Sequence, residues 1–501
     1  MKVINSKQAA ELIADGATII PGGFGSCGHG DALTKAIQKR FLETGKPEKI
    51  NLLFASGAGD KSGNGLDRLA YPGLVNRAIG GFWALNPKLT EMGLSGEIEA
   101  HNWPQGVISN LFKEIARGSL GFITKVGINT FVDPEVEGGS FSRLKSDSLV
   151  EDVFIKEQRF LLYPAQKIDV ALLRGTKADE LGNISFENET AYMDSLAQAQ
   201  AAKNCGGIVI VQVKEIVKAK SLNPYFVKIP SFLVDYVVVA DEEDHPETYG
   251  RAAAKKFVNQ KQNAALEVVD TAKEIIVRRG MKELNKAGGG CVNLGIGIPA
   301  LIGEQMQHSS DNKFVLTIES GVIGGNPESD LSFGASLNPQ AIIEQSELFN
   351  IYDGGGIAIS FLGFAQADQQ GNVCVSRFNN RVPGAGGFIN ISQSAQALCF
   401  CGTMTAGGLD VAIENGKLKI LREGKTRKFV DAVEQITFSS SSGNFCSRSV
   451  LFITERAVFQ LKNCSLELIE IAPGITVDDL KKVMDCAFSV SNELIEMTLS
   501  D

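Results

Sequence analysis

A carboxylate directly after a predicted strand is the residue in this sequence best suited to chemistry. Residues 314–318 read Phe-Val-Leu-Thr-Ile, a short apolar and β-branched run that predicts a buried parallel strand. Glu319 follows at once, and glycines at 321, 324 and 325 predict a tight loop that lets a bulky substrate approach. Because ligands of open α/β sheets bind outside the carboxyl ends of the strands, we expect Glu319 in a functional site. A structural alternative stays open, since a glutamate at a strand end often forms a salt bridge or caps a helix.

Two glycine-rich turns each come between a predicted strand and a predicted helix. They carry the spacing of dinucleotide-binding turns, with Gly23, Gly25 and Gly28 in the first and Gly295, Gly297 and Ala300 in the second. Glu319 lies about where a ribose-binding acid would follow the second turn, so an NAD(P)-dependent oxidoreductase is one hypothesis. Against it, Ala55 stands where the first half would need its acid, and Pro299 interrupts the second turn. A simpler interpretation is that both turns only bend the backbone from strand to helix.

The elements around these residues alternate between strands and helices, which predicts an α/β fold with parallel sheets. Strands are expected at residues 17–20, 51–55, 169–173, 207–213 and 291–294, and helices at 7–14, 32–41, 107–116 and 271–284. Ser6 and Asp270 are the expected N-caps of the first and last of these helices.

The second half of the sequence repeats the first. Ala-Asp-Glu-Leu-Gly-Asn-Ile at 178–184 resembles Ala-Asp-Gln-Gln-Gly-Asn-Val at 367–373, an offset of 367 − 178 = 189. The apolar strand at 208–210 meets the one at 397–399 at the same offset, 397 − 208 = 189. A shared offset and a shared order of elements indicate a duplicated domain.

We therefore expect two tandem homologous open α/β domains. The first covers residues 1–270 and includes a charged connector at about 241–270, and the second covers 271–501 and carries Glu319. The two copies should share one topology, with Asn183 and Asn372 at equivalent places.

Composition limits the possible classes of function. The chain has 501 residues and a net charge of −9, without a basic tail, which argues against nucleic-acid binding. No apolar run approaches the roughly 18 residues of a transmembrane helix, and residues 1–13 lack the pattern of a signal peptide. The nine Cys are odd in number and form no C-x-x-C pair, and the four His lack zinc-like spacing. We expect no metal, buried free thiols such as Cys399 and Cys401, and a cytoplasmic location.

Two longer motifs and several short ones carry a resemblance to a known family. The motifs Asp-Gly-Ala-Thr-Ile-Ile-Pro-Gly-Gly-Phe-Gly-Ser-Cys-Gly at 15–28 and Glu-Ser-Gly-Val-Ile-Gly-Gly at 319–325 are similar to the first and second signatures of the family I CoA-transferases. In that family the second signature carries the catalytic glutamate. Further motifs resemble the single-chain acetate and propionate branch: 104–106, 133–139, 333–336, 353–356, 376–381, 386–391 and 471–475.

The signatures also depart from the family pattern. Gly30 stands where the first signature usually has Pro, and Pro21 interrupts its apolar run. The succinyl-CoA:3-ketoacid branch has Ser-Glu-Asn-Gly in its second signature, whereas residues 318–321 are Ile-Glu-Ser-Gly. This difference favours the acetate and propionate branch and leaves the acyl acceptor open.

The resemblance implies transfer of coenzyme A between a short-chain acyl-CoA and a free carboxylate such as acetate, propionate or butyrate. The reaction would be ping-pong through a thioester on Glu319, because a carboxylate is ionised at pH 7 and attacks without a histidine base. Gln105 and the backbone N–H groups of Gly386 and Gly387 would stabilise the oxyanions, in a site between the two domains. Coenzyme A would be substrate and covalent intermediate, with no permanently bound cofactor. Alternatives are an acetoacetate CoA-transferase, an acyl-CoA hydrolase on the same scaffold, and the oxidoreductase above.

The resemblance also implies a set of CoA-contacting residues and a homo-oligomer. Phe24 would narrow the acyl pocket, and cationic side chains would bind the phosphates of CoA. The expected contacts are Gly23, Phe24, Gly25, Gly28, Lys125, Gly295, Gly297, Arg377 and Arg381.

Overall fold

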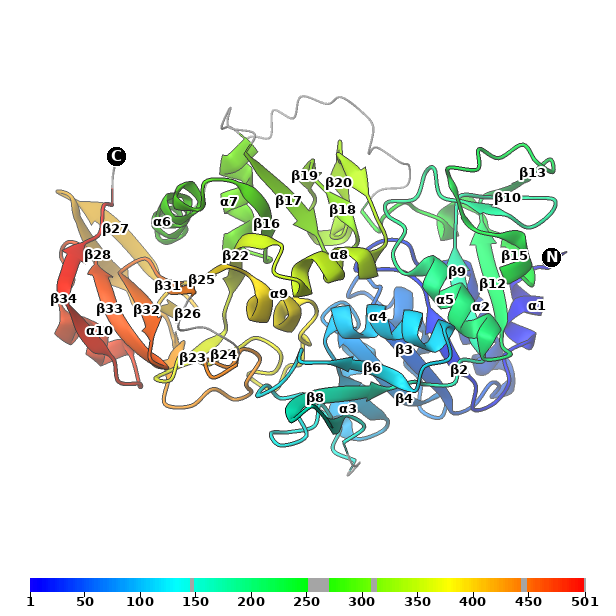
Figure 1. The fold of residues 1–501 in the computed structure, drawn as a ribbon, viewed down its shortest axis with the longest axis horizontal. Helices are drawn as coiled ribbons and strands as arrows, with labels where there is room; N and C mark the ends of the chain where they lie inside the picture. The colour runs from blue at the N-terminus through cyan, green and yellow to red at the C-terminus, as the bar shows by residue number, and fades with distance from the viewer. Residues whose placement is uncertain (145–147, 251–269, 308–312, 443–447, 500–501) are drawn as a thin grey trace. The chain divides into compact units, whose positions relative to one another are not determined.

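The computed structural model describes residues 1–144, 148–250, 270–307, 313–442 and 448–499 (Figure 1). Contacts divide the chain into two compact units. Unit 1 contains Met1–Val258, Ile318–Asn350 and Val382–Asn390, and unit 2 contains Asn259–Thr317, Ile351–Arg381 and Ile391–Asp501. Segments from both halves of the sequence thus meet in unit 1. The domain boundary near residue 270 stays a prediction, and much of the expected connector lies outside the described residues.

Unit 1 is built on an eight-stranded sheet in the order β1-β15-β12-β9-β2-β3-β4-β5. Every neighbouring pair in it is parallel. The strands are β1 (Lys2–Val3), β2 (Thr18–Pro21), β3 (Ile50–Ser56), β4 (Val75–Phe82), β5 (Glu99–Asn102), β9 (Val170–Arg174), β12 (Ile208–Val213) and β15 (Tyr236–Val239).

Helices cover both faces of this sheet, because alternate side chains of each strand point to opposite faces. Leu53 and Ala55 of β3 belong to a core with side chains of α4 and α5, whereas Leu52 and Phe54 belong to a second core with α1, α2 and α3. The helices are α1 (Ser6–Glu11), α2 (Asp31–Thr44), α3 (Pro87–Ser95), α4 (Gln105–Ala116) and α5 (Ser195–Asn204). The expected α/β fold is therefore confirmed.

Smaller strands complete unit 1. One antiparallel sheet has the order β6-β8-β7, and another has the order β13-β10-β11-β14. The strands of these two sheets are β6 (Gly121–Thr124), β7 (Glu151–Ile155), β8 (Gln158–Pro164), β10 (Lys177–Asp179), β11 (Ile184–Ser185), β13 (Glu215–Val217) and β14 (Val227–Ile229). Four short strands follow Gly321: β18 (Val322–Ile323), β19 (Asn326–Pro327), β20 (Ser336–Leu337) and β21 (Ala341–Ile342).

The main strands of unit 2 follow the order β17-β16-β22-β25-β31-β32-β33-β34. They are β16 (Gly290–Leu294), β17 (Phe314–Ile318), β22 (Ile357–Gly363), β25 (Ala397–Cys401), β31 (Ser449–Ile453), β32 (Ala457–Lys462), β33 (Ser465–Ile471) and β34 (Ser489–Glu496). The helices of this region are α6 (Thr271–Ala287), α7 (Ile298–Gln307), α8 (Gln345–Asp353), α9 (Phe388–Ser394) and α10 (Val477–Val483). The division between the units falls inside β17, α8 and α9.

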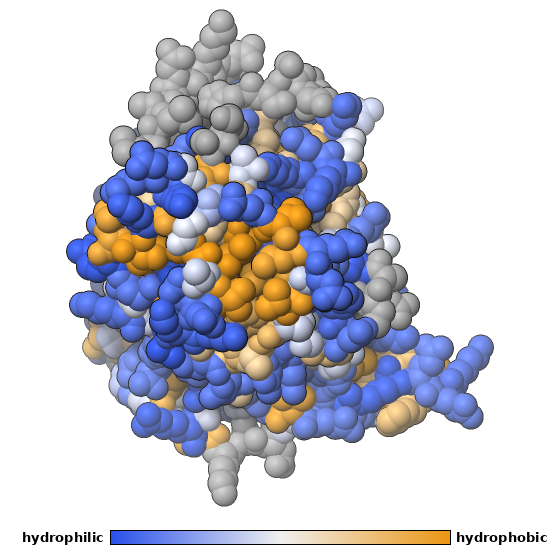
Figure 2. Space-filling view, turned by 90° about the vertical axis from the view of Figure 1, so that its left-hand side faces the viewer, coloured by the Kyte–Doolittle hydropathy of each residue, from blue (hydrophilic) through white to orange (hydrophobic). Residues whose placement is uncertain are grey.

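Short strands complete this part of the chain: β23 (Gln366–Asp368), β24 (Val373–Cys374), β26 (Thr405–Ala406), β27 (Asp410–Glu414), β28 (Lys417–Arg422), β29 (Thr426–Arg427) and β30 (Phe429–Val430). The last strand of the large sheet, β34, exposes Val490 and Ile495. On the side of the molecule where Figure 1 shows the red C-terminal strands, Figure 2 shows an apolar area framed by hydrophilic residues.

The two halves of the sequence share one strand order. β15-β12-β9-β2-β3 in the first half corresponds to β31-β25-β22-β16-β17 in the second. The repeated turns also match in detail. Asn183 donates to Asp179 and its Oδ1 accepts from the N–H of Ser231 at 3.0 Å. Asn372 donates to Asp368 in the same way, and its Oδ1 accepts from Ser440 at 3.1 Å. The predicted duplication is confirmed.

Two further properties follow from the described ranges of the chain. Within them, no helix combines the length and apolar character needed to cross a membrane. In the same ranges, no group of three or more His, Cys, Asp or Glu side chains could hold a metal ion.

Candidate functional site

A hydrogen-bonded turn holds Glu319 at the carboxyl end of β17. The N–H of Gly321 donates to the carbonyl of Ile318 at 3.0 Å, and Gly321 has a φ of +103° that favours glycine. Ser320 is fully buried and its hydroxyl donates to the carbonyl of Gly334 at 2.8 Å. The backbone on the C-terminal side of Glu319 is thus fixed, while the Glu319 side chain itself is half-buried.

The first glycine-rich turn packs against this strand end. Phe24 and Met193 form a small apolar cluster with Ile318, the residue before Glu319, and Phe333 packs against it. Gly25 has a φ of +58°, and a Cβ there would lie 2.8 Å from the Phe333 ring, so any larger residue would displace that ring. Phe24 is 1% exposed and its ring lies 5.6 Å from that of Phe333. Phe24 therefore supports Phe333 from within the core.

Gln105 comes from a different part of the sequence and meets one of the predicted glycines. It is the first residue of α4, after Pro104, and its N–H donates to the carbonyl of Gly386 at 2.9 Å. The N–H of Gly386 donates to the carbonyl of Gly81, also at 2.9 Å. The N–H of Gly386 is therefore already used within the protein. Of the two predicted backbone donors to the oxyanion, Gly386 and Gly387, only the N–H of Gly387 is kept as a prediction.

Two half-buried aromatic rings join the surroundings of Glu319 to those of Gln105. The rings of Phe82 and Phe333 lie 6.2 Å apart. Phe82 lies 3.5 Å from where a Cβ on Gly386 would be, and that position is 3.7 Å from Oε1 of Gln105. An apolar wall thus runs from the cluster under Glu319 to the turn beside Gln105. Neither ring was assigned a function from the sequence.

A buried polar network lies behind Gln105. Its Nε2 donates to Oε1 of Gln345 at 3.3 Å, and Nε2 of Gln345 donates to Asp194 at 2.6 Å. Ser109, one helical turn after Gln105, donates to the same Asp194 oxygen at 2.9 Å. All four residues are at most 3% exposed: Gln105 is 3%, Gln345 and Asp194 are 2% and Ser109 is 0% exposed. Sequence reasoning missed Gln345 and Asp194, because nothing local marks them.

The pKa values of Asp194, in this network, and of Glu344, the residue before Gln345, are both raised. Burial raises the pKa of Asp194 to about 7. Burial, and then the negative charge of Asp194, raise the pKa of Glu344 to about 8, against the opposing charges of Lys228 and Lys113.

These two shifts predict a pH dependence of stability. The ordinary pKa is 3.8 for Asp194 and 4.5 for Glu344. Between pH 3.8 and about 7 for Asp194, and between 4.5 and about 8 for Glu344, the folded protein therefore keeps a proton that the unfolded chain has lost. The contribution of the pair to the free energy of unfolding is therefore fully present below the ordinary pKa values of 3.8 and 4.5. It falls progressively as pH rises and is lost once pH passes the folded-state pKa values of about 7 and about 8. Urea titrations across this range should show that the double variant Asp194→Asn, Glu344→Gln has a flatter profile. Parallel profiles for the two proteins would contradict the shifts.

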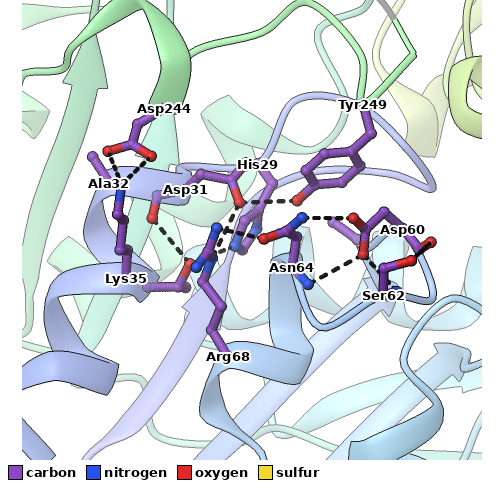
Figure 3. Close-up of polar contacts among 12 residues, drawn as sticks. His29, Asp31, Ala32, Lys35, Asp60, Ser62, Asn64, Arg68, Asp244 and Tyr249 are labelled. Atoms are coloured by element: carbon purple, nitrogen blue, oxygen red, sulfur yellow. Dashed lines mark hydrogen bonds and ion pairs between the residues drawn. The ribbon is translucent and has the colours of Figure 1, made fainter.

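A second polar network fixes the helix that follows the first glycine-rich turn (Figure 3). Asp31, in the first turn of α2, accepts from the hydroxyl of Tyr249 at 3.0 Å and lies 3.6 Å from the guanidinium of Arg68. The N–H of Ala32 donates to the side chain of Gln212 at 2.9 Å. A bound pyrophosphate would need free backbone N–H groups at the N-terminal end of α2. The protein uses the N–H of Ala32 there for its own hydrogen bond to Gln212. The geometry gives the turn a packing role, and CoA contacts of Gly23, Gly25 and Gly28 stay predictions.

The remaining predicted contacts are not gathered around Glu319 by any described interaction. Lys125 donates to Gln158 at 3.0 Å and lies 5.2 Å from the Phe160 ring centre. The other residues belong to unit 2, where Gly297, Arg377 and Arg381 are exposed and Gly295 is half-buried. A phosphate-binding role for these residues stays a prediction.

Comparison with known proteins is consistent with this site. A family model described as Coenzyme A transferase matches residues 3–240. The chain is 42% identical to caffeate CoA-transferase of Acetobacterium woodii, over 99% of this chain and 96% of that protein. It is 37% identical to acetate CoA-transferase YdiF of Escherichia coli K12, over 98% and 93% of the two chains.

A solved structure agrees with the fold. The chain superposes on the acyl-CoA transferase YdiF of Escherichia coli O157:H7, in a thioester complex with CoA, with a TM-score of 0.90 and 36% identity over 99% of this chain and 95% of that one. Full-length similarity of this degree decides against the nucleotide-dependent oxidoreductase that the glycine-rich turns also allowed. The chain is therefore a member of the coenzyme A transferase family and an enzyme of that class.

Proposed function

We propose that this enzyme transfers coenzyme A between a short-chain acyl-CoA and a free carboxylate, through a thioester on Glu319. The observation that carries the proposal is the turn after β17, which holds Glu319 in the compact unit that also contains Gln105. The thioester complex of the similar Escherichia coli enzyme supports this chemistry for the fold.

The proposed reaction has two similar half-reactions. The Glu319 carboxylate attacks the acyl-CoA carbonyl carbon, and the CoA thiolate leaves to give a mixed anhydride. The thiolate then attacks the glutamyl carbonyl and expels the first carboxylate, which leaves glutamyl-CoA. An incoming carboxylate reverses these steps and departs as the new acyl-CoA. No net proton transfer is needed, which fits a site built around a carboxylate and amide groups.

Donors and apolar walls would serve different parts of this reaction. Each attack places negative charge on a carbonyl oxygen, and fixed donors such as the Gln105 amide lower the barrier to its formation. Phe82 and Phe333 would exclude water from the mixed anhydride and so favour transfer over hydrolysis. The hydrolase alternative is the weaker one for this reason.

Cys27 is a poor competitor for the nucleophile role. Burial raises the pKa of Cys27, in the first glycine-rich turn, to about 12. A thiol with that pKa is protonated at neutral pH and does not attack a thioester.

The acceptor has two candidates. Similarity to an acetate CoA-transferase supports a small acid such as acetate or propionate. Similarity to a caffeate CoA-transferase, at the higher identity of 42%, supports an aromatic acid as the second candidate. Relative kcat/KM values for acetate, propionate and caffeate with one acyl-CoA donor would separate them. An acetoacetate acceptor is less supported, since the succinyl-CoA:3-ketoacid relatives are 25–28% identical.

We further propose a cytoplasmic homo-oligomer without a permanently bound cofactor. The exposed apolar residues of β34 are compatible with contact between copies, since an edge strand is a natural pairing surface.

Intact-mass spectrometry tests the proposal directly. Enzyme incubated with acetyl-CoA and no acceptor should gain the mass of CoA less water, and peptide mapping should place it on Glu319. Hydroxylamine should inactivate the loaded enzyme and spare the unloaded one, because it attacks the glutamyl thioester. A loaded acetyl group instead of CoA, or CoA on a cysteine, would show that another mechanism operates.

A further inference from the structure

We propose that Gln345 is a positioning residue that sets the orientation of the Gln105 side-chain amide, and that Asp194 in turn orients Gln345. The inference rests on the proposed oxyanion role of Gln105. It concerns three side chains that are far apart in the sequence and adjacent in unit 1: Gln105 is 240 residues from Gln345, and Gln345 is 151 residues from Asp194.

The argument starts at Asp194. Its carboxylate accepts from Ser109 at 2.9 Å and from Nε2 of Gln345 at 2.6 Å, on one and the same oxygen. Above its pKa of about 7, Asp194 is a carboxylate whose oxygens can only accept, so Gln345 must present its NH₂ group to it. The carbonyl oxygen of Gln345 then faces away from Asp194, toward Gln105.

The constraint passes on to Gln105 by the same logic. The Oε1 of Gln345 accepts from Nε2 of Gln105 at 3.3 Å. An amide oxygen cannot bond to another amide oxygen, so the Gln105 NH₂ group is directed to Gln345 and Oε1 lies on the side of Gly386. One N–H of Gln105 serves Gln345, which leaves the second N–H of the same group for a developing oxyanion. Without the relay, the amide could rotate and present its own oxygen, which would repel that charge.

The surroundings make this constraint rigid. Gln345 is 2% exposed and Ser109 0%, so water does not compete for their hydrogen bonds. The backbone N–H of Gln345 donates to the carbonyl of Met193 at 2.9 Å, next to Asp194 in the chain. Gln345 is therefore anchored to residues 193 and 194 by its main chain and by its side chain.

Gln345 also connects the relay to the nucleophile. The N–H of Ile343, two residues earlier, donates to the carbonyl of Gly321 at 2.9 Å. A Cβ on Gly321 would lie 2.1 Å from the carbonyl oxygen of Ile343, so the two backbones are in close contact. One short segment, residues 343–345, thus contacts the Glu319 turn at one end and the Gln105 amide at the other.

A double-mutant cycle tests the relay. Gln345→Leu removes the amide at similar volume, and Gln105→Ala removes the donor. We expect Gln345→Leu to slow formation of glutamyl-CoA by about tenfold or more, below the loss for a whole oxyanion donor, with KM for acyl-CoA changed less than about twofold. In the Gln105→Ala background the same change should have an effect of less than about twofold, because the group it orients is gone. Additive losses would overturn the relay.

Two controls separate the relay from a loss of packing and from a failure of the proposed function. Gln198→Leu removes another buried glutamine of the same unit. It should keep normal turnover, and its effect should add to that of Gln105→Ala. If Gln345→Leu does not fold, Asp194→Asn replaces it, since an asparagine no longer dictates the orientation of Gln345 and should show the same coupling to Gln105. Normal rates for both variants, with Gln105→Ala slow, would refute the relay alone. Normal rates for Gln105→Ala would refute the oxyanion role itself.

Discussion

Glu319→Gln should lose CoA transfer by at least about 10⁴-fold, on the scale of removing a catalytic nucleophile. The substitution keeps the shape of the side chain, and the turn that holds it depends on the backbone of Ile318 and Gly321 rather than on the carboxylate. What it removes is the ionised oxygen that attacks the acyl-CoA. Initial rates, intact mass after acyl-CoA, and CoA affinity by calorimetry should be measured on the same preparation, and we expect CoA binding to survive.

Two companion variants make this result specific. Glu319→Ala should behave as Glu319→Gln does, which excludes slow deamidation of the glutamine as a source of residual activity. Glu304→Gln, at an exposed glutamate of α7, should keep wild-type rates. Substantial transfer by Glu319→Ala would refute the role of Glu319 as nucleophile. The membership of the chain in the coenzyme A transferase family would not be affected.

Gln105→Ala should slow both half-reactions by about 10²-fold to 10³-fold, the usual loss for one oxyanion donor. The two half-reactions should suffer alike, since each passes through the same kind of tetrahedral oxyanion. Single-turnover measurement of glutamyl-CoA formation and breakdown would show both. The fold should persist, because the Gln105 hydrogen bond to Gly386 uses the backbone N–H and survives in alanine.

Asn110→Ala provides the matched control for Gln105. It removes an amide from the same helix, where the Asn110 side chain donates to the carbonyl of Gly106 at 3.1 Å. A buried amide that only bonds to its own helix should affect stability more than the rate of transfer. Equal rate losses for Asn110→Ala and Gln105→Ala would mean that the site responds to general loosening of α4, and Gln105 would lose its assigned role.

Elements with strong local patterns were predictable from the sequence. The apolar run at Phe314–Ile318 is a strand with those bounds, and Asp270 caps α6 by accepting from the N–H of Lys273. The repeat was also predictable, because the Asp–Asn turn makes its hydrogen bonds within a few residues. At the first helix the cap prediction was wrong by one position: Asn5, not Ser6, is the N-cap, since Asn5 and Gln8 form a reciprocal capping box.

The polar network and the apolar wall could not be predicted in this way. Gln345 and Asp194 acquire their role only from each other and from Gln105, across separations of 151 and 240 residues. Phe82 and Phe333 become a wall only when two strand ends and a loop converge, and a single phenylalanine in a sequence carries no sign of that. The sequence also could not show that the N–H of Gly386 is unavailable to an oxyanion, because its partner, the carbonyl of Gly81, is remote in the chain.

The interleaving of unit 1 has a consequence for how the protein is made. Gln105 leaves the ribosome 386 − 105 = 281 residues before Gly386, an interval of roughly 15–60 s at ordinary rates of translation. Once β15 has left the ribosome, the nascent N-terminal half can form its large sheet. Until residues 318–333 follow, it still lacks Ile318 and Phe333, the side chains that pack against Phe24 and Met193. That exposed apolar surface is a natural target for chaperones, and a chain that stalls between residues 258 and 318 should aggregate rather than yield a smaller active enzyme.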